Sequence, residues 1–378
     1  MDLDAILGTV LEDAREMIAC ESPSTDLAAV ARSADVVARV GERRLGAAPE
    51  RIVLDGRTHL RWRLGTGPSR VLLLGHHDTV WPLGSLKTHP CTVEGGVLRG
   101  PGCLDMKVGL AMAFHAAAGQ DGVTVLVTGD EELGSPSSRG LVEDEARLAE
   151  AALVLEAAAD GGALKHERKG VSLYDVRLVG RAAHAGLEPE RGVNATLELA
   201  TQVLAVAALG DPAAGTTVTP TSARAGVTTN TVPATGSFAV DVRVRSVAEQ
   251  DRVDAAVRAL RPSLAGAAVE VHGGPNRPPL EAASSAALLE RARAVAASIG
   301  LPPLTASAVG GASDGNFTAG VGTPTLDGLG AVGGGAHADD EHVLLDPLPG
   351  RAALLRALVA DLLAAPTNAV AAARGARP

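Results

Sequence analysis

The chain of 378 residues has few aromatic side chains and no long hydrophobic run. Phe, Trp and Tyr together make up 2% of the residues, although hydrophobic residues as a class make up 46%. A membrane-spanning helix needs about 18 or more consecutive apolar residues, and no stretch of the sequence reaches that length. The apolar side chains therefore belong to the cores of a globular protein, and we expect no insertion into a membrane.

Positive charge and cysteine are also scarce. The formal net charge is -10, and no cluster of Lys and Arg is interleaved with aromatic residues, so we expect no nucleic-acid partner. Cys20, Cys91 and Cys103 are odd in number and far apart, which fits a reducing compartment better than a disulfide framework. The first 20 residues mix acidic and apolar residues at helical spacing, unlike a secretory signal. We therefore predict a cytoplasmic protein.

The length points to two domains. From about residue 51 to 160, short apolar runs alternate with helical segments, the pattern of a parallel α/β sheet. We predict buried strands at residues 71–74, 123–127 and 153–155, and a helix at residues 107–118. From residue 171 the predicted order is strand, helix, strand, strand, helix and strand, a ferredoxin-like βαββαβ unit. Its second helix is expected at residues 247–264 and its last strand at residues 268–272, and the Gly-Gly-Pro sequence at 273–275 is expected to end it.

These patterns predict one discontinuous domain with a compact insert. An α/β catalytic domain, with a mainly parallel sheet flanked by helices, is expected from residues 1–168 and 278–378. Residues 169–277 are expected to form the inserted ferredoxin-like domain. Residues from about Pro366 lack an apolar stripe, and we expect them to be frayed.

Each predicted strand of the catalytic domain runs into polar residues. The first is followed by residues 76–78 (HHD), the second by 129–132 (GDEE) and the third by Glu156, while Asp105 lies at the Gly-rich entrance to the helix. Polar strand ends are common, and carboxylates also favour the first turn of a helix. However, the carboxyl ends of parallel strands line one crevice, so these groups should converge. Histidines and carboxylates without thiolates suit Zn²⁺, or Mn²⁺ or Co²⁺ in its place.

The order of these motifs resembles the M20 metallopeptidases, and within them the glutamate carboxypeptidases of the carboxypeptidase G type. The resemblance covers nearly the whole chain. Its motifs are, in order, residues 75–80 (GHHDTV), 100–102 (GPG) leading to 105–107 (DMK), 130–132 (DEE), Glu156, 184–186 (HAG), 230–233 (NTVP), 241–243 (DVR), 313–314 (SD), and His337 before 340–341 (DE).

The resemblance implies two Zn²⁺ ions and a role for each residue around them. Asp105 bridges the two metals, with Glu132 and His337 completing one site and His76 and Glu156 the other. Asp78 holds the His76 ring in its ligating tautomer. Glu131 binds no metal; it takes a proton from the attacking water and returns it to the leaving amine. His77 is expected to be a packing residue.

The resemblance also implies roles for residues farther along the chain. His184 stabilises the oxyanion in the active site of the other subunit, which implies a homodimer formed through residues 169–277, the lid and dimerisation domain. Asn230 and Arg243 bind the carboxylate of the substrate, although an exposed strand face also explains Arg243. The loop with Ser313 and Asp314 lines the carboxylate pocket. Met106 and the two alanines after Glu156 depart from the family pattern without removing a ligand.

We therefore predict a metal-dependent hydrolase that cleaves an amide bond next to a free carboxylate, above all one that releases C-terminal glutamate from peptide or folate-like conjugates. An N-acyl-amino-acid amidohydrolase or a dipeptidase uses the same mechanism. A catalytically silent binding protein is a further alternative, disfavoured because it has no need of Glu131.

A serine hydrolase using Ser313 is the last alternative. Residues 311–315 match G-x-S-x-G, with Asp327, His337 and His342 downstream. A nucleophile of this type must open a helix, and we expect none after Ser313, because Gly320, Gly322 and Pro324 follow. The G-x-G-x-x-G match at residues 328–333 is not followed by the helix of a dinucleotide site.

Overall fold

The computed structural model describes residues 3–366 and divides into two compact units. The first unit combines the chain up to Glu167 with Leu280–Val309 and the segment from Ser313 onward, and the second comprises Arg168–Pro279 with Gly310–Ala312. The prediction for the segment after Pro366 lies outside the described residues. Among the helices of residues 3–366, none is both long enough and apolar enough to span a bilayer.

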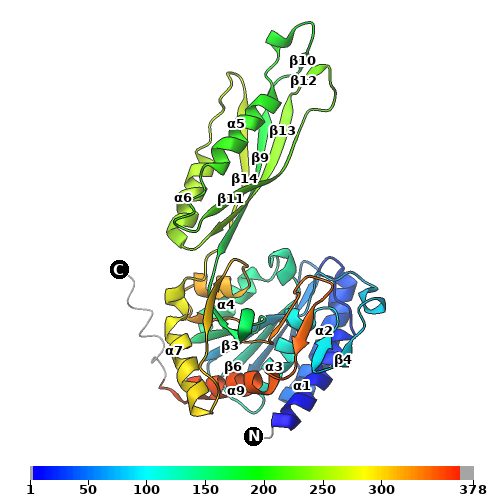
Figure 1. The fold of residues 1–378 in the computed structure, drawn as a ribbon, viewed down its shortest axis with the longest axis vertical. Helices are drawn as coiled ribbons and strands as arrows, with labels where there is room; N and C mark the ends of the chain where they lie inside the picture. The colour runs from blue at the N-terminus through cyan, green and yellow to red at the C-terminus, as the bar shows by residue number, and fades with distance from the viewer. Residues whose placement is uncertain (1–2, 367–378) are drawn as a thin grey trace. The chain divides into compact units, whose positions relative to one another are not determined.

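The first unit is built on a six-stranded, mainly parallel sheet in the order β1-β2-β6-β3-β7-β16 (Figure 1). Its parallel strands are β3 (Val71–His76), β6 (Val123–Thr128), β7 (Ala151–Val154) and β16 (Thr325–Leu326). The hairpin of β1 (Glu50–Leu54) and β2 (Arg57–Leu64) adds an antiparallel edge beside β6. The predicted α/β class and mainly parallel sheet are confirmed.

Helices cover both faces of this sheet. Successive residues of β3 alternate between them, since Leu73 packs in one core while Leu72 and Leu74 pack in another. The first core receives α1 (Leu3–Ile18), α2 (Leu27–Leu45), α3 (Val108–Ala117), α7 (Ala282–Ser298) and α9 (Leu348–Ala364), and the second receives α4 (Arg139–Leu148) and α8 (Gly315–Gly320). Because both faces are covered, β3 and β6 are buried along their whole length.

Two smaller sheets complete the first unit. One has the order β17-β18-β5-β4, and the other pairs β15 with β8. Their strands are β4 (Thr92–Glu94), β5 (Val97–Arg99), β8 (Leu164–Arg168), β15 (Ala306–Val309), β17 (Gly333–Gly334) and β18 (His342–Leu344). The pairing of β18 with β5 aligns His342 with Arg99. It therefore brings the residues just before β18 next to the turn that follows β5.

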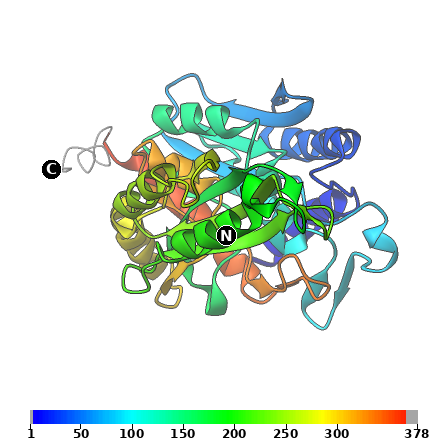
Figure 2. The same ribbon diagram turned by 90° about the horizontal axis from the view of Figure 1, so that it is seen from above.

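The second unit has the element order of a ferredoxin-like fold. Its elements are β9 (Gly170–Val179), α5 (Ala195–Ala207), β11 (Thr217–Ala225), β13 (Thr235–Val244), α6 (Val247–Arg258) and β14 (Ala268–Arg277). The antiparallel sheet has the order β11-β13-β9-β14. Both helices cover one face of this sheet (Figure 2). Tyr174, Phe238 and Val240 pack with them in one core. The short strands β10 (Ala183–His184) and β12 (Thr231–Val232) pair separately. A role of this unit as a lid or dimerisation domain stays a prediction.

Two predicted boundaries in this unit were wrong. Strand β14 continues through the Gly-Gly-Pro sequence to Arg277, because Gly273 has φ 86° and lies so close to β9 that an added Cβ would come within 2.2 Å of the Leu173 carbonyl oxygen. Pro275 is tolerated since β14 is an edge strand. Helix α6 ends at Arg258 rather than at residue 264, since Pro262 follows and disfavours helical backbone in the residue before it.

Candidate metal centre

The carboxyl ends of the central parallel strands bring the predicted ligands together. His76 is the last residue of β3, Glu131 and Glu132 lie in a short turn after β6, and Glu156 follows β7. Parallel strands end at the same edge of a sheet, so residues far apart in sequence meet there. Asp105 comes from the helical turn Cys103–Lys107 that precedes α3, and His337 from the loop between β17 and β18.

Asp105 lies at the middle of the cluster. Its Oδ1 is 3.2 Å from Nε2 of His76, and its Oδ2 is 3.2 Å from Nε2 of His337. On the far side of His76, Oε1 of Glu156 lies 3.7 Å from the same Nε2. On the other side, Oε2 of Glu132 lies 3.2 Å from Nε2 of His337. The two oxygens of one carboxylate thus face two different imidazole–carboxylate pairs.

The donor atoms of this cluster fit cations. His76, Asp105 and Glu132 offer one ligand atom each within 4.8 Å of one another, and so do His76, Glu131 and Glu156. Oε1 of Glu132 is buried and has no hydrogen-bond partner among the described residues, an arrangement that is costly unless a positive group neutralises it. Imidazole and carboxylate donors are those that zinc and similar divalent ions accept. Glu131 lies within ligand distance, so its role as acid–base rather than ligand stays a prediction.

The pKa shifts within the cluster also fit a cation-binding site. Burial alone raises the pKa of Asp105, but hydrogen bonds from His337 and His76 hold it well below its usual range. Hydrogen bonds to Asp105 and Glu132 raise the pKa of His337 to about 10. Two protonated imidazoles thus supply the positive charge that the carboxylates require in the metal-free protein. Divalent cations bound by these side chains would take over that charge and displace those protons.

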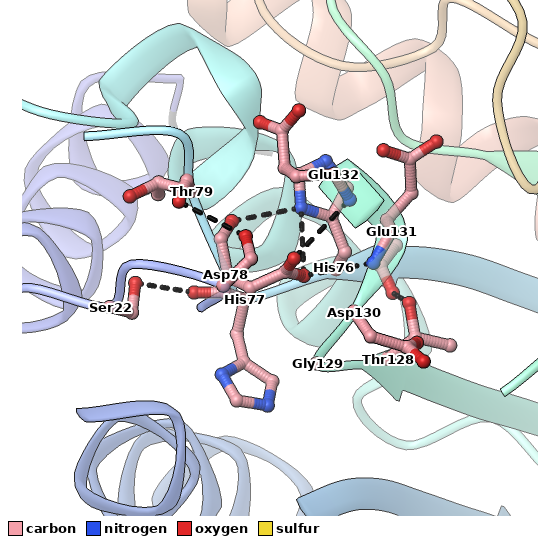
Figure 3. A network of polar contacts seen from close by, with 12 residues as sticks. Ser22, His76, His77, Asp78, Thr79, Thr128, Gly129, Asp130, Glu131 and Glu132 are labelled. Carbon is pink, nitrogen blue, oxygen red and sulfur yellow. Dashed lines mark hydrogen bonds and ion pairs between the residues drawn. The ribbon is translucent and has the colours of Figure 1, made fainter. Parts of the chain in front are cut away.

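Asp78 positions several residues of the cluster through its buried carboxylate. Its fully buried carboxylate has Oδ1 3.4 Å from Nδ1 of His76, and the same Nδ1–H donates to the Asp78 backbone oxygen at 3.0 Å. The backbone N–H groups of Glu131 and Glu132 donate to the two carboxylate oxygens at 3.2 and 3.3 Å (Figure 3). One carboxylate therefore fixes the ring of His76, with Nε2 facing the cluster, and the turn that carries two further acidic residues.

Glu341 has a positioning role that the sequence did not reveal. Its buried carboxylate accepts backbone hydrogen bonds from Gly102, Leu104 and Asp105 at 3.0, 2.8 and 3.1 Å, and one from Nε1 of Trp81 at 2.6 Å. These bonds hold the turn that presents Asp105. The motif at residues 340–341 was noted in the sequence, but its function depends on the pairing of β18 with β5.

Ser313 and Asp314 are both buried in the first unit. Asp314 accepts hydrogen bonds from Thr128, at 3.0 Å, and from Ser135. The Ser313 hydroxyl is fully buried and donates to Asp327 at 2.6 Å. The expectation that no helix follows Ser313 was wrong, since α8 begins at Gly315 with Phe317 in the core. Burial of the hydroxyl nevertheless disfavours a serine nucleophile, and the predicted substrate contacts of both residues stay predictions.

His77 is not available to a metal. Its Nδ1 lies 3.1 Å from the Ser33 hydroxyl and its Nε2 lies 3.0 Å from the Thr58 carbonyl oxygen. Burial lowers its pKa to about 4. The prediction that His77 is a packing residue is confirmed.

Three predicted residues, His184, Asn230 and Arg243, lie in the second unit, whereas the predicted metal ligands lie in the first. The pairing of β10 with β12 brings His184 and Asn230 together, and the Ala185 N–H donates to the Asn230 backbone oxygen at 2.9 Å. Nδ1 of His184 accepts backbone N–H groups from Gly186 and Leu187, each at 3.1 Å. In the neutral ring the proton therefore resides on Nε2, and this nitrogen can donate a hydrogen bond.

Arg243 already has a partner on its own strand. Its Nε and one terminal nitrogen donate to the two carboxylate oxygens of Asp241 at 2.8 and 2.9 Å. The pair is half-buried. To bind Arg243, the carboxylate of a substrate has to share the guanidinium with Asp241 or displace Asp241 from it. The predicted role of Arg243 stays a prediction.

Histidines and carboxylates clustered at the carboxyl edge of a parallel α/β sheet are a ligand set that metal-dependent hydrolases use. The family model of peptidase family M20/M25/M40 matches residues 72–361, and the chain belongs to this family. It is 33% identical over 295 residues to carboxypeptidase G2 of Pseudomonas sp. (strain RS-16), covering 74% of this chain and 70% of that protein. The chain is therefore a hydrolase of the metallopeptidase family that acts on peptide bonds.

Solved structures share the fold. Aminopeptidase PepT of Bacillus cereus superposes with a TM-score of 0.73 at 21% identity, covering 94% of this chain and 98% of that one. A dinuclear metal-binding peptidase of the M20 family from Bacillus subtilis superposes with a TM-score of 0.64 at 14% identity, covering 96% and 99% of the two chains.

Proposed function

We propose that this protein uses two divalent cations to hydrolyse an amide bond next to a free carboxylate, and that its main reaction is the release of C-terminal glutamate. The observation that carries the proposal is Asp105, whose two oxygens face two different imidazoles. Oε1 of the nearby Glu132 has no hydrogen-bond partner within residues 3–366. The likeness to carboxypeptidase G2 supports a carboxypeptidase. The spacing from His184 through Arg243 resembles the glutamate-specific branch.

The residues divide the chemistry between them. His76, Glu156, Asp105, Glu132 and His337 would hold the cations, which would polarise the scissile carbonyl and lower the pKa of a bound water. Zn²⁺ is our first choice, with Co²⁺ or Mn²⁺ as substitutes.

Glu131 receives the proton of the attacking water and delivers it to the leaving nitrogen. The Nε2–H of His184, whose Nδ1 is engaged by backbone N–H groups, donates to the oxyanion. Asn230 and Arg243 hold the substrate carboxylate.

The experiment is hydrolysis of a small panel, with and without chelation followed by Zn²⁺ add-back. N-benzoyl-glutamate is compared with N-acetyl amino acids and plain dipeptides. Cleavage confined to glutamate conjugates, lost on chelation and restored by zinc, supports the proposal. Zinc-dependent cleavage of acetylated amino acids or dipeptides alone keeps the mechanism but makes the protein an amidohydrolase or a dipeptidase. Metal binding without any cleavage makes it a binding protein.

We also propose that the second unit forms a homodimer. Leu197 and Leu204 of α5 are 58% and 72% exposed, and Leu187 is 76% exposed. Large apolar side chains that gather on one face of a helix mark interaction surfaces more often than scattered ones do. A second copy of this chain is the partner that the family resemblance implies.

The cysteines support a cytoplasmic setting for this enzyme. All three are free thiols, and Cys103, the first residue of the turn that carries Asp105, is buried in the core. Burial raises the pKa of the Cys103 thiol and keeps it unreactive. Unpaired cysteines of this kind are typical of a reducing compartment.

A further inference from the structure

A cavity of about 330 Å³ adjoins the metal cluster within the first unit. It is lined by Val80, Trp81, Pro82, Ser85, Thr88, His89, His337 and Asp339. His337 belongs both to this wall and to the metal cluster, where it contacts Asp105 and Glu132. A substrate whose amide bond lies at the cluster therefore places one of its two halves next to the cavity.

Trp81 gives the cavity an aromatic wall. The chain has two tryptophans, and the other, Trp62, packs in the core against Phe114 with ring centroids 5.2 Å apart. Trp81 is instead only partly buried, and its ring centroid lies 4.8 Å from that of His89. Its Nε1–H donates to buried Glu341 at 2.6 Å. The indole is therefore held in place while part of its surface stays open.

The chemistry of the lining suits an uncharged, flat group. The residues that line the cavity include no Lys or Arg, which are the side chains that bind carboxylates best, and Asp339 adds a negative charge. A cavity of about 150 Å³ already takes a benzene molecule, so this one has room for a ring with substituents. Aromatic rings stack on indole and imidazole surfaces in offset or edge-to-face geometry.

We propose that this cavity is the acyl-side subsite, and that Trp81 and His89 select substrates whose acyl group is aromatic. The inference rests on the proposed function, since it assigns one half of the substrate of that reaction. The negatively charged amino-acid half lies away from the cavity, and the aromatic acyl half stacks on the indole. The subsite acts on specificity, because Trp81 contacts the acyl group rather than the reacting atoms.

The test compares two substrates that share the leaving half, N-benzoyl-glutamate and N-acetyl-glutamate. In the zinc-loaded enzyme, Trp81→Ala is expected to lower kcat/KM for the benzoyl compound roughly 10- to 100-fold while changing that for the acetyl compound less than about threefold. Trp81→Phe keeps a ring and is expected to retain most of the preference, and His89→Ala to lose part of it. Val53→Ala, at an exposed apolar residue of β1, is the matched control and leaves both substrates unchanged.

Equal losses for both substrates overturn the inference, because they show that Trp81 only supports the metal site through Glu341. Unchanged selectivity overturns it as well. If the wild type cleaves neither compound, the proposed function fails, and binding then decides the inference. The tryptophan fluorescence of Trp81 reports on ligand binding in the cavity, since the other tryptophan, Trp62, is buried in the core. A saturable change in tryptophan fluorescence with N-benzoyl-glutamate but not with N-acetyl-glutamate, weakened by His89→Ala, upholds the inference, and the absence of such a change overturns it.

Discussion

Asp105 and Glu131 lie in the same acidic cluster, but the proposed chemistry needs them for different reasons. Asp105 contacts both imidazoles, so it joins the two halves of the site. Glu131 lies close enough to His76 and Glu156 to serve as a ligand or to exchange a proton with water beside them. The metal content of variants separates these two roles.

We predict that Glu131→Ala abolishes turnover while both metals stay bound, because removal of a general acid–base costs roughly 10²- to 10⁴-fold in rate. Asp105→Ala is expected to lose metal and activity together. The measurement is the zinc-to-protein ratio by atomic emission after gel filtration, combined with steady-state kinetics. Loss of zinc in Glu131→Ala makes this residue a ligand, and substantial activity in either variant contradicts the assignment of the site.

Glu341 is expected to act on metal affinity without touching the metal. In Glu341→Gln the amide nitrogen, itself a donor, faces the backbone N–H groups of Gly102, Leu104 and Asp105, so the turn is held less firmly. Loss of such a supporting contact typically weakens metal affinity about 10- to 100-fold. Competition with a chromophoric chelator measures this affinity. Asp346→Asn, at an exposed residue of the same segment, is the control, and equal affinity in the two variants contradicts the role of Glu341.

The strand-end pattern of the sequence was enough to gather His76, Asp105, Glu132 and Glu156, because parallel strands place their carboxyl ends at one edge. The same pattern could not assign Glu341 or Asp314. Their partners at Gly102–Asp105, Thr128 and Ser135 lie more than 170 residues away. Such roles depend on which distant segments pair, and no local residue pattern records that pairing.

Among helices and strands, packing decided where local propensity was ambiguous. The glycines and proline at residues 320–324 argued against a helix, yet α8 forms and ends at Gly320, because Phe317 fills the core on one face of the sheet. The Gly-Gly-Pro sequence at residues 273–275 argued for a strand end, yet pairing with β9 continues. The long periodic elements β3, β6 and α3 were predicted correctly, because their apolar pattern alone determines them.

The junction of β2, β3 and β6 contains two neutral imidazoles that make stability depend on pH. Nδ1 of His59 accepts the Gly129 N–H at 3.1 Å, and burial lowers the pKa of His59, as it lowers that of His77 to about 4. The unfolded chain binds protons at these sites from about pH 6.5, whereas the folded chain does not until lower pH. This part of the stability is therefore present above pH 6.5 and is lost as the pH falls toward 4.

We predict that the metal-free protein loses stability at these two sites between pH 7 and 4.5, with about 2 kcal/mol of the loss at His77. Urea unfolding at several pH values measures the slope. His77→Gln keeps a donor for the Thr58 carbonyl oxygen and His59→Asn keeps an acceptor for the Gly129 N–H, so each reduces the slope with the fold intact. His272→Gln, at a half-exposed histidine of β14, serves as the control. An unchanged slope in both core variants contradicts the account.

For the molecule as a whole, the proposed reaction needs residues from both units. The proposed metal ligands and Glu131 belong to the first, and His184 with Asn230 belongs to the second. Leu197 and Leu204 offer the second unit an apolar surface for a second copy. A twofold dimer makes each interface contact twice, so each active site can draw its His184 from the partner chain.

We predict that inactive variants complement one another if His184 acts across the dimer. Glu131→Ala and His184→Ala are each expected to be nearly inactive, since loss of an oxyanion donor costs roughly 10²- to 10³-fold in kcat. In a mixed dimer one site receives an intact Glu131 from one chain and an intact His184 from the other. One of the two sites of an isolated mixed dimer is therefore complete, which restores at most about one half of wild-type activity. Co-expression with two different affinity tags isolates the mixed dimer. The controls are bound zinc in the mixed dimer and full activity of His272→Ala. If the mixed dimer regains no activity under these conditions, His184 does not act in the partner's site.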